Sequence, residues 1–387
     1  MNETLYLRYK AVAVYKRVAE QAAPLAELLR ADSVARRVEL CAEVFSRVAE
    51  SGFTTTGEWL RSLVLTDDNV FSRAAACGAR IPDAVKAQVN GELITFKQFS
   101  LLKPDDFDLG AAADFAPRFV CGGFTGSVSS LAAFYAKSGC GAFARGNAFV
   151  YKDGGLTAAA VEPVRLDDLK NYAEEKSEIV RNTENFINGL PAFHTLLYGD
   201  RGTGKSTTVR AIANEYRDRL KVIELAKTEL KSLPRLRESL RGFKQKYILF
   251  IDDLSFDEND GGADEFKTAL EGSLDAQASD ALIYCTSNRR HLYKETDKSA
   301  MRHAADEVQA ELALFDRFGL VVTYINPDKA EFVDILRQIL RSRGIKWRDE
   351  YAQIAELAAL KKGGRSPRAA KQIADLIEST YAERRSE

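Results

Sequence analysis

The sequence predicts an α/β fold in which parallel strands alternate with helices, with mainly helical regions before and after it. Five short apolar runs support this prediction: HTLLY at 194–198, KVIEL at 221–225, YILFI at 247–251, ALIYC at 281–285 and LVVTYI at 320–325. The runs are nearly continuous in hydrophobic residues, as expected for parallel strands that helices cover on both faces. Segments with helical patterning separate the runs, which favours βαβ units.

The flanking regions complete the predicted domain organisation. Residues 1–118 are expected to form a mainly helical N-terminal domain, in which one buried stripe is formed by residues spaced four and three apart: Val34, Val38, Cys41, Phe45 and Val48. Residues 119–160 are predicted to be a glycine-rich connecting segment. The α/β domain is expected at 161–326, after a boundary near Pro163, and a helical domain at 327–387.

The composition excludes several protein classes. The chain has 387 residues, of which 45% are hydrophobic and 29% charged, and this matches an ordinary globular protein with more than one domain. No apolar run is long enough to cross a bilayer, and the start MNETLYLRYK does not have the pattern of a signal peptide. We therefore expect a cytoplasmic protein without membrane contact.

The cysteines, the histidines and the net charge bear on three features: disulfides, transition-metal sites and nucleic-acid binding. The five cysteines form no CxxC pair and the three histidines have no zinc-ligand spacing, so neither a disulfide framework nor a transition-metal site is expected. The net charge of -1 provides no global positive field for nucleic acid. Local basic segments, at 235–246 and at Arg289 and Arg290, leave nucleic-acid binding open, and solvated helix faces are the alternative.

A phosphate-loop pattern, GxxxxGK[ST], follows the first apolar run and precedes a helical segment. It consists of Gly199, Asp200, Arg201, Gly202, Thr203, Gly204, Lys205 and Ser206, and Thr207 comes next. Glycine permits a close approach to phosphate and the following helix directs its positive end inward, so backbone N–H groups are expected to wrap the β-phosphate of ATP. Lys205 is expected to reach the β- and γ-phosphates, and the Ser206 hydroxyl to bind Mg²⁺. The other glycine-rich run, CGGFTG at 121–126, lacks the Gly-Lys-Ser/Thr ending and is attributed to turns and close packing.

Two acidic residues end the third apolar run, in YILFIDDLSF. Asp252 is expected to hold the Mg²⁺ of Mg-ATP, mostly through water. Asp253 is expected to orient or deprotonate the attacking water, which is the general-base role in phosphoryl transfer. The alternative is that two acids merely cap a strand.

Two further polar residues become candidates in this context. Asn288 follows the fourth apolar run, where its amide is expected to hydrogen-bond the attacking water or the γ-phosphate, unless it is only a turn residue. Ser366 and Pro367 predict a helix start, which places Arg368 in the first turn of that helix. A cation there opposes the helix dipole, so a nearby anion such as a γ-phosphate would explain it, and a tolerated surface arginine is the alternative.

With these motifs assembled, residues 161–385 resemble an AAA+ ATPase. The chain most resembles an uncharacterised bacterial family called domain of unknown function 815. The segments that carry this resemblance are NTENFINGLPAFHTLLYGDRGTGKSTTV, FIDDLSF, CTSNRRHL, FDRFGL and GGRSPRAAKQI. The resemblance implies an AAA+ P-loop NTPase with a five-stranded parallel sheet and a C-terminal helical lid, ATP and Mg²⁺ as cofactors, and a homo-oligomer. It also implies Asn288 as sensor one, Arg317 as an arginine finger and Arg368 as sensor two.

The sequence departs from the usual AAA+ pattern at two positions. Most AAA+ proteins end the acidic motif with Asp-Glu, whereas this chain has Asp253 as the second acid, and the shorter side chain favours slow hydrolysis. Asn171 stands where relatives often carry a glycine beside the adenine.

These observations favour an ATPase that works in an oligomer to remodel or load an unknown protein or nucleic-acid partner. A slow nucleotide-gated binding module, or a DNA-associated loader with little turnover, is the alternative from a different class. A small-molecule kinase would need an acceptor pocket and usually no arginine from a neighbour, so FDRFGL and the helical tail weigh against it. The first 150 residues contain no motif that indicates a substrate.

Overall fold

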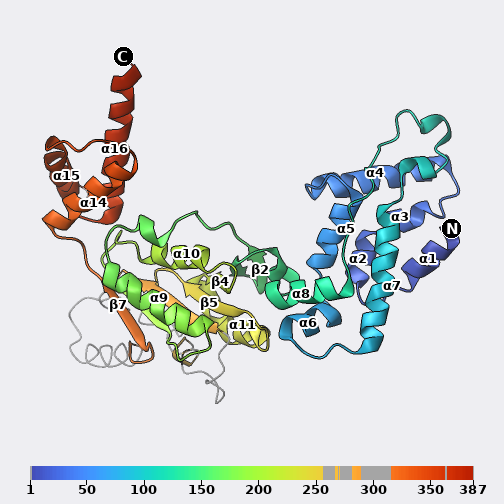
Figure 1. Cartoon of the computed structure of the whole chain (residues 1–387), viewed down its shortest axis with the longest axis horizontal. Coiled ribbons are helices and arrows are strands. Elements are labelled where there is room, and N and C mark those ends of the chain that lie inside the picture. The colour runs from blue at the N-terminus through green and yellow to red at the C-terminus, as the bar shows by residue number, and fades with distance from the viewer. Residues whose placement is uncertain are drawn as a thin grey trace, which may run out of the picture. The chain divides into compact units, whose positions relative to one another are not determined.

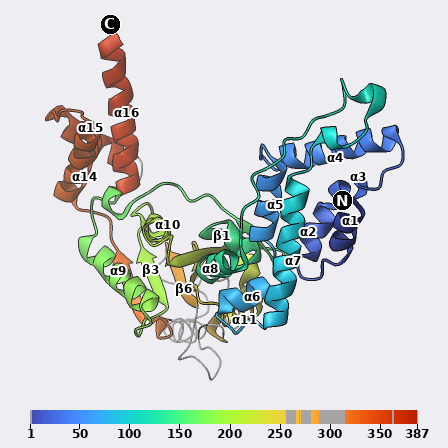
Figure 2. The ribbon, with the colours of Figure 1, turned by 45° about the vertical axis from the view of Figure 1, so that its right-hand side comes forward.

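The computed structural model describes residues 2–255, 266–268, 270, 281–288, 315–361 and 364–386. Contacts between residues divide the chain into two compact units. The first unit contains Met1–Gly146 and Gly242–Gln245, and the second contains Asn147–Arg241 and Lys246–Glu387. Figures 1 and 2 show helices throughout the first unit and a sheet in the second. Among the described residues, none of the helices combines the length and apolar character that a membrane span requires.

The first unit is built from helices. They are α1 (Asn2–Lys10), α2 (Lys16–Gln21), α3 (Ala23–Leu28), α4 (Val34–Glu50), α5 (Thr56–Leu65), α6 (Val70–Cys77), α7 (Asp83–Ser100) and α8 (Val128–Ser138), with short 3-10 helices η1 (Pro104–Asp106), η2 (Gly110–Ala112) and η3 (Gly141–Arg145). Side-chain caps begin several of them: Thr55 and Glu58, for example, form a reciprocal capping box at the start of α5. The mainly helical character predicted for this part of the chain is confirmed.

The predicted buried stripe on α4 is only partly right. Cys41 and Val48 are buried, but Val34 and Phe45 are exposed. The face that packs inward instead contains Leu40 and Val44 beside those two residues. Apolar residues spaced three and four apart can be chosen along either of two neighbouring faces of the same helix. The packing of the helix against its neighbours determines which of the two faces is buried.

The second unit contains a seven-stranded sheet with the order β2-β1-β4-β5-β6-β3-β7. The strands are β1 (Ala148–Lys152), β2 (Gly155–Ala158), β3 (Thr195–Gly199), β4 (Leu220–Leu225), β5 (Lys246–Ile251), β6 (Ala281–Ser287) and β7 (Leu320–Tyr324). All neighbouring pairs are parallel except the β1–β2 pair. The five predicted parallel strands are confirmed as β3 to β7.

The hairpin β1–β2 adds two strands to the five that the sequence predicts. It lies within the segment predicted to be only connecting, and β1 pairs with β4 in register Phe149 to Ile223. The hairpin gives a weak sequence signal because β2, with the sequence GLTA, has only four residues, three of them exposed.

Helices cover the sheet and fix the position of its strand ends. α9 (Ala173–Ile187) and α10 (Lys205–Glu215) share one hydrophobic core with β3 to β7, in which Ile179, Phe186 and Val209 pack against Leu197 and Tyr324. Further helical segments among the described residues of this part include η4 (Leu166–Asp168), η5 (Lys227–Ser232) and α11 (Leu233–Leu240). The burial of these strands explains why they form apolar runs in the sequence.

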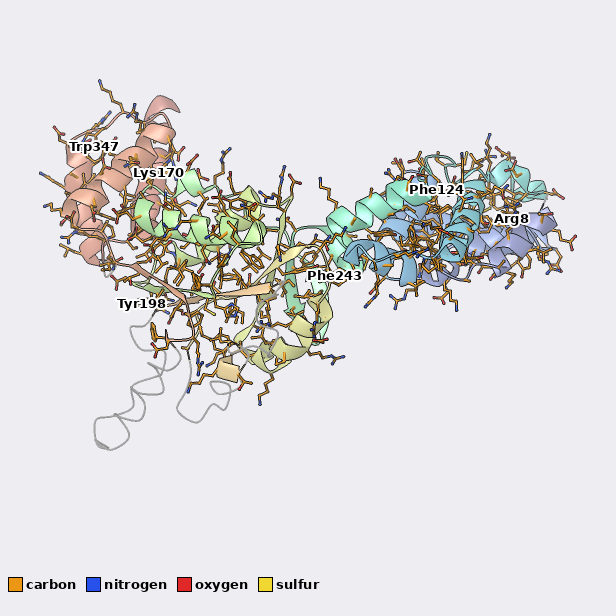
Figure 3. All side chains as sticks on the ribbon, turned by 60° about the horizontal axis from the view of Figure 1, so that its bottom comes forward. Arg8, Phe124, Lys170, Tyr198, Phe243 and Trp347 are labelled. Carbon is orange, nitrogen blue, oxygen red and sulfur yellow. The ribbon has the colours of Figure 1, made fainter. Side chains whose placement is uncertain are left out.

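The C-terminal helices form a small core of their own, and we call them the lid. They are α14 (Lys329–Ser342), α15 (Glu350–Lys361) and α16 (Pro367–Ser386). Asp328 caps α14 together with Glu331, and residues such as Phe332, Leu336 and Ile373 pack between the helices. Trp347, labelled in Figure 3, packs against the guanidinium of Arg337, whose Cζ lies 4.7 Å from the centroid of the indole ring.

Candidate functional site

The phosphate-loop pattern lies between the end of β3 and the start of α10. Gly199, Gly202 and Gly204 have φ angles of +128°, +76° and +100°, which glycine adopts at little cost. A Cβ atom at Gly199 would lie 2.0 Å from the backbone oxygen of Tyr324, so no other residue fits there. The loop therefore presents backbone N–H groups and the positive end of α10 to the same space, which is the arrangement that binds phosphate.

Lys205 lies inside this loop and is only 4% exposed. Its ammonium donates hydrogen bonds to the backbone oxygens of Gly199 and Asp200, at 2.9 and 2.7 Å. Burial lowers the pKa of Lys205 to about 8. Both of these acceptors are neutral backbone oxygens, and a phosphate in the loop would supply a negative charge to the buried ammonium.

Asp200 connects the phosphate loop by a hydrogen bond to the segment between β7 and α14. Its carboxylate accepts a hydrogen bond of 2.8 Å from the backbone N–H of Asn326, two residues after β7. Its backbone oxygen accepts a second bond, of 2.8 Å, from the Thr203 hydroxyl. Asp200 therefore shapes the loop instead of directing its charge at a phosphate.

Ser206 and Asp252 are brought together although 46 residues separate them in the sequence. The Ser206 hydroxyl donates a 2.5 Å hydrogen bond to Oδ1 of Asp252. Arg210, one helical turn after Ser206, has its guanidinium 3.7 Å from Oδ2 of the same carboxylate. A hydroxyl and a carboxylate side by side are oxygen ligands of the kind that Mg²⁺ prefers, so the donor set fits the metal expected with ATP.

Asp253 and Asn288 also lie in contact. The Asn288 amide donates a 2.7 Å hydrogen bond to Oδ1 of Asp253. Asp253 has φ +53°, a left-handed conformation that aspartate tolerates better than most residues and that turns the chain at the end of β5. The structure thus places both predicted side chains at the ends of the neighbouring strands β5 and β6.

The lid contacts the phosphate loop through the start of α16. The backbone N–H of Arg368 donates a 3.1 Å hydrogen bond to the backbone oxygen of Gly202. Ser366 caps α16 by accepting a bond from the backbone N–H of Ala369, as the sequence predicts. The side chain of Arg368 is exposed. The backbone bond to Gly202 places this residue beside the phosphate loop.

Arg317 lies apart from these residues. It is exposed and precedes β7 by three residues, and the N–H of Leu320 at the start of β7 bonds to His194 just before β3. Because β3 and β7 are parallel, this places Arg317 near the beginning of both strands, whereas the phosphate loop follows the end of β3. The other arginines considered from the sequence, Arg289 and Arg290, lie outside the described residues.

Sequence reasoning missed two residues of this site. Thr286 on β6 contacts both acidic residues, and Arg210 faces Asp252. Arg210 has a detectable signal because it lies four residues after Ser206 on a helix, so both project from the same face. Thr286 has none, because it belongs to a continuous buried strand.

Comparison with known proteins identifies the family. A family model described as Protein of unknown function (DUF815) matches residues 144–381. The chain belongs to this family. The strand order of the DUF815 protein and its phosphate loop confirm the AAA+ P-loop fold that the sequence predicts.

Curated relatives match shorter parts of this DUF815 protein. It is 37% identical over 99 residues to an AAA-ATPase of Arabidopsis thaliana, which covers 24% of the chain and 18% of the relative. It is 33% identical over 109 residues to the replication factor C large subunit of Sulfolobus acidocaldarius, covering 26% and 23%. The match thus spans less than a quarter of the length of either relative.

Solved structures of one bacterial protein resemble the DUF815 protein weakly. RuvB of Thermotoga maritima, a Holliday junction branch migration motor, has a TM-score of 0.40 and 18% identity over 57% of this chain and 65% of its own.

Proposed function

We propose that this DUF815 protein binds ATP with Mg²⁺ and hydrolyses it to ADP and phosphate within a homo-oligomer. The single observation that carries the proposal is the contact between the Ser206 hydroxyl and Asp252. It brings the phosphate loop and the strand-end carboxylate to one point, where a metal ion bound to phosphate finds both ligands.

In this proposal the loop from Gly199 to Thr207 binds the phosphates through its backbone N–H groups and Lys205. Ser206 and Asp252 hold Mg²⁺, which when bound neutralises charge on the phosphates. Asp253 takes the proton of the attacking water, and Asn288 orients that water or the γ-phosphate. The 2.7 Å bond between these two residues keeps the short Asp253 side chain near its place of action.

Two arginines complete the proposed site. Arg368 lies in the first turn of α16, and its backbone N–H bonds to Gly202, so its side chain is proposed to reach a γ-phosphate in the loop. Arg317 lies near the beginning of β3, away from the loop of its own chain. Its position therefore supports a role in the site of a neighbouring subunit, which makes oligomerisation part of the proposal.

Phosphate release at a range of protein concentrations tests this proposal. We expect Mg²⁺-dependent release whose rate per chain rises with concentration until the oligomer is saturated, and no release by Lys205→Ala. Concentration-independent release by a monomer would contradict the shared site while leaving the ATPase assignment intact.

The purpose of the cycle is proposed to be the remodelling or loading of a protein or nucleic acid. The similarity to replication factor C large subunits makes DNA one partner to test. Affinity capture with Asp253→Asn protein in the presence of ATP, with Lys205→Ala as the matched control, should retain the partner only when nucleotide is bound.

A slow nucleotide-gated binding module is the second candidate. The contact between Asp253 and Asn288 favours it, because an aspartate is shorter than the usual glutamate and is already hydrogen-bonded. Single-turnover hydrolysis slower than the dissociation of the partner would support this candidate over the remodelling cycle.

A further inference from the structure

Thr286 lies on the strand between the two strands that lead into the phosphate loop and the acidic pair Asp252 and Asp253. It lies on β6, between β5 on one side and β3 on the other, next to Leu197 in the register of β3. Its neighbour Cys285 pairs with Ile251, the last residue of β5. Thr286 is only 2% exposed.

Three contacts join Thr286 to the segment that follows β5. Its hydroxyl donates a 2.5 Å hydrogen bond to Oδ1 of Asp252 and accepts one of 2.9 Å from the backbone N–H of Asp253. Its backbone oxygen accepts a 2.7 Å bond from the N–H of Leu254. One residue therefore holds the side chain of the first acid and the backbone of the second.

The chemistry of the hydroxyl explains why a threonine fits here. The left-handed turn at Asp253 ends the regular pairing of β5, so the N–H of Asp253 needs another acceptor. A hydroxyl has one hydrogen to donate and lone pairs to accept, and can satisfy the Asp252 carboxylate and the Asp253 N–H together. Valine has the same shape as threonine but can do neither.

The hydroxyls of Thr286 and Ser206 both donate to the same oxygen of Asp252. One donor lies at the start of helix α10 and the other on strand β6, so together they fix the rotation of the carboxylate relative to the phosphate loop. Among the described residues, Ser206 would still donate to Asp252 in the absence of Thr286, and the guanidinium of Arg210 lies 3.7 Å from Oδ2 of the carboxylate. The carboxylate then has freedom to turn away from the loop.

We propose that Thr286 is a positioning residue for the magnesium site, and that its hydroxyl orients Asp252 toward the metal and fixes the turn that presents Asp253. This inference rests on the proposed function and deepens it. Groups that orient a metal ligand through a hydrogen bond typically contribute 10- to 100-fold to metal affinity or activity.

The test compares Thr286→Val, which removes the hydroxyl, with Thr286→Ser, which keeps it. A fluorescent ATP analogue is titrated into each protein with excess Mg²⁺ and again with EDTA. The ratio of the two affinities measures the contribution of the metal. For Thr286→Val we expect unchanged affinity in EDTA, a loss of about tenfold or more in the Mg²⁺-dependent gain, and a matching fall in phosphate release. Thr286→Ser should recover the gain.

The inference is overturned if Thr286→Val keeps the full Mg²⁺-dependent gain, or if it loses affinity equally with Mg²⁺ and with EDTA, which indicates a merely structural role. Thr286→Ala serves as a second hydroxyl deletion should the valine variant fail to fold. The unmutated protein separates this inference from the proposed function: if it binds no nucleotide at all, the proposed function fails before Thr286 is tested.

Discussion

Lys205 makes the affinity for ATP depend on pH in a measurable way. Its pKa is about 8 in the nucleotide-free protein because the ammonium is buried, against an ordinary value of 10.5. Phosphates in the loop favour the charged form and raise this pKa again. ATP therefore binds with uptake of a proton wherever the free protein has lost one, and affinity is full below pH 8 and falls above it.

The pKa of Lys205 determines how far the affinity for Mg-ATP falls as the pH rises. With a value of about 8, roughly nine tenths of the free protein carries the Lys205 proton at pH 7 and roughly one tenth at pH 9. The affinity for Mg-ATP should therefore fall about tenfold between these pH values. At pH 8.5, binding should take up about 0.8 proton per ATP.

Calorimetric titration with Mg-ATP, in buffers that differ in ionisation enthalpy, measures this proton directly. Lys221 provides the matched control, because burial lowers its pKa to about 8 as well but it lies on β4. Lys221→Met should leave the proton uptake unchanged. Equal affinity at pH 7 and pH 9, together with no proton uptake at pH 8.5, would refute the reasoning about Lys205.

Three further predictions concern the other proposed site residues. Asp253→Asn should bind ATP normally but stop phosphate release, because the amide keeps the shape and loses the basicity; unchanged release would place the base elsewhere. Arg368→Ala should remove the difference in protease sensitivity of the lid between ATP and ADP, and no such difference in the unmutated protein would count against the role. Arg317→Ala should bind ATP but release phosphate roughly 10³- to 10⁵-fold more slowly. Mixing it with Lys205→Ala protein should restore some activity, since one chain supplies the intact loop and the other the arginine; no recovery in mixed oligomers would make Arg317 a structural residue.

Local sequence patterns are sufficient to predict the five parallel strands β3 to β7 and the phosphate loop. Buried parallel strands must be apolar along their whole length, and the loop needs glycine at positions such as Gly199, where a Cβ atom would overlap the backbone of Tyr324. Both requirements act on consecutive residues, so they are visible in the sequence. The hairpin β1–β2 is too short and too exposed to meet either requirement.

The contacts within the site depend on strand order, which no local pattern contains. β6 lies between β5 and β3, so it brings Thr286 beside Asp252 and Asn288 beside Asp253. Neither pair is close in sequence. The same holds for Asp200, whose bond to the backbone of Asn326 exists only because β7 pairs with β3.

The central claim is that the phosphate loop and Asp252 hold ATP together with Mg²⁺. The most direct measurement is a calorimetric titration of the unmutated protein with ATP, with Mg²⁺ and with EDTA, alongside Lys205→Ala and Asp252→Asn. We expect tight binding that Mg²⁺ strengthens in the unmutated protein, no binding by Lys205→Ala, and binding without the Mg²⁺-dependent gain by Asp252→Asn. Normal ATP affinity in Lys205→Ala, or a full Mg²⁺-dependent gain in Asp252→Asn, would contradict the claim.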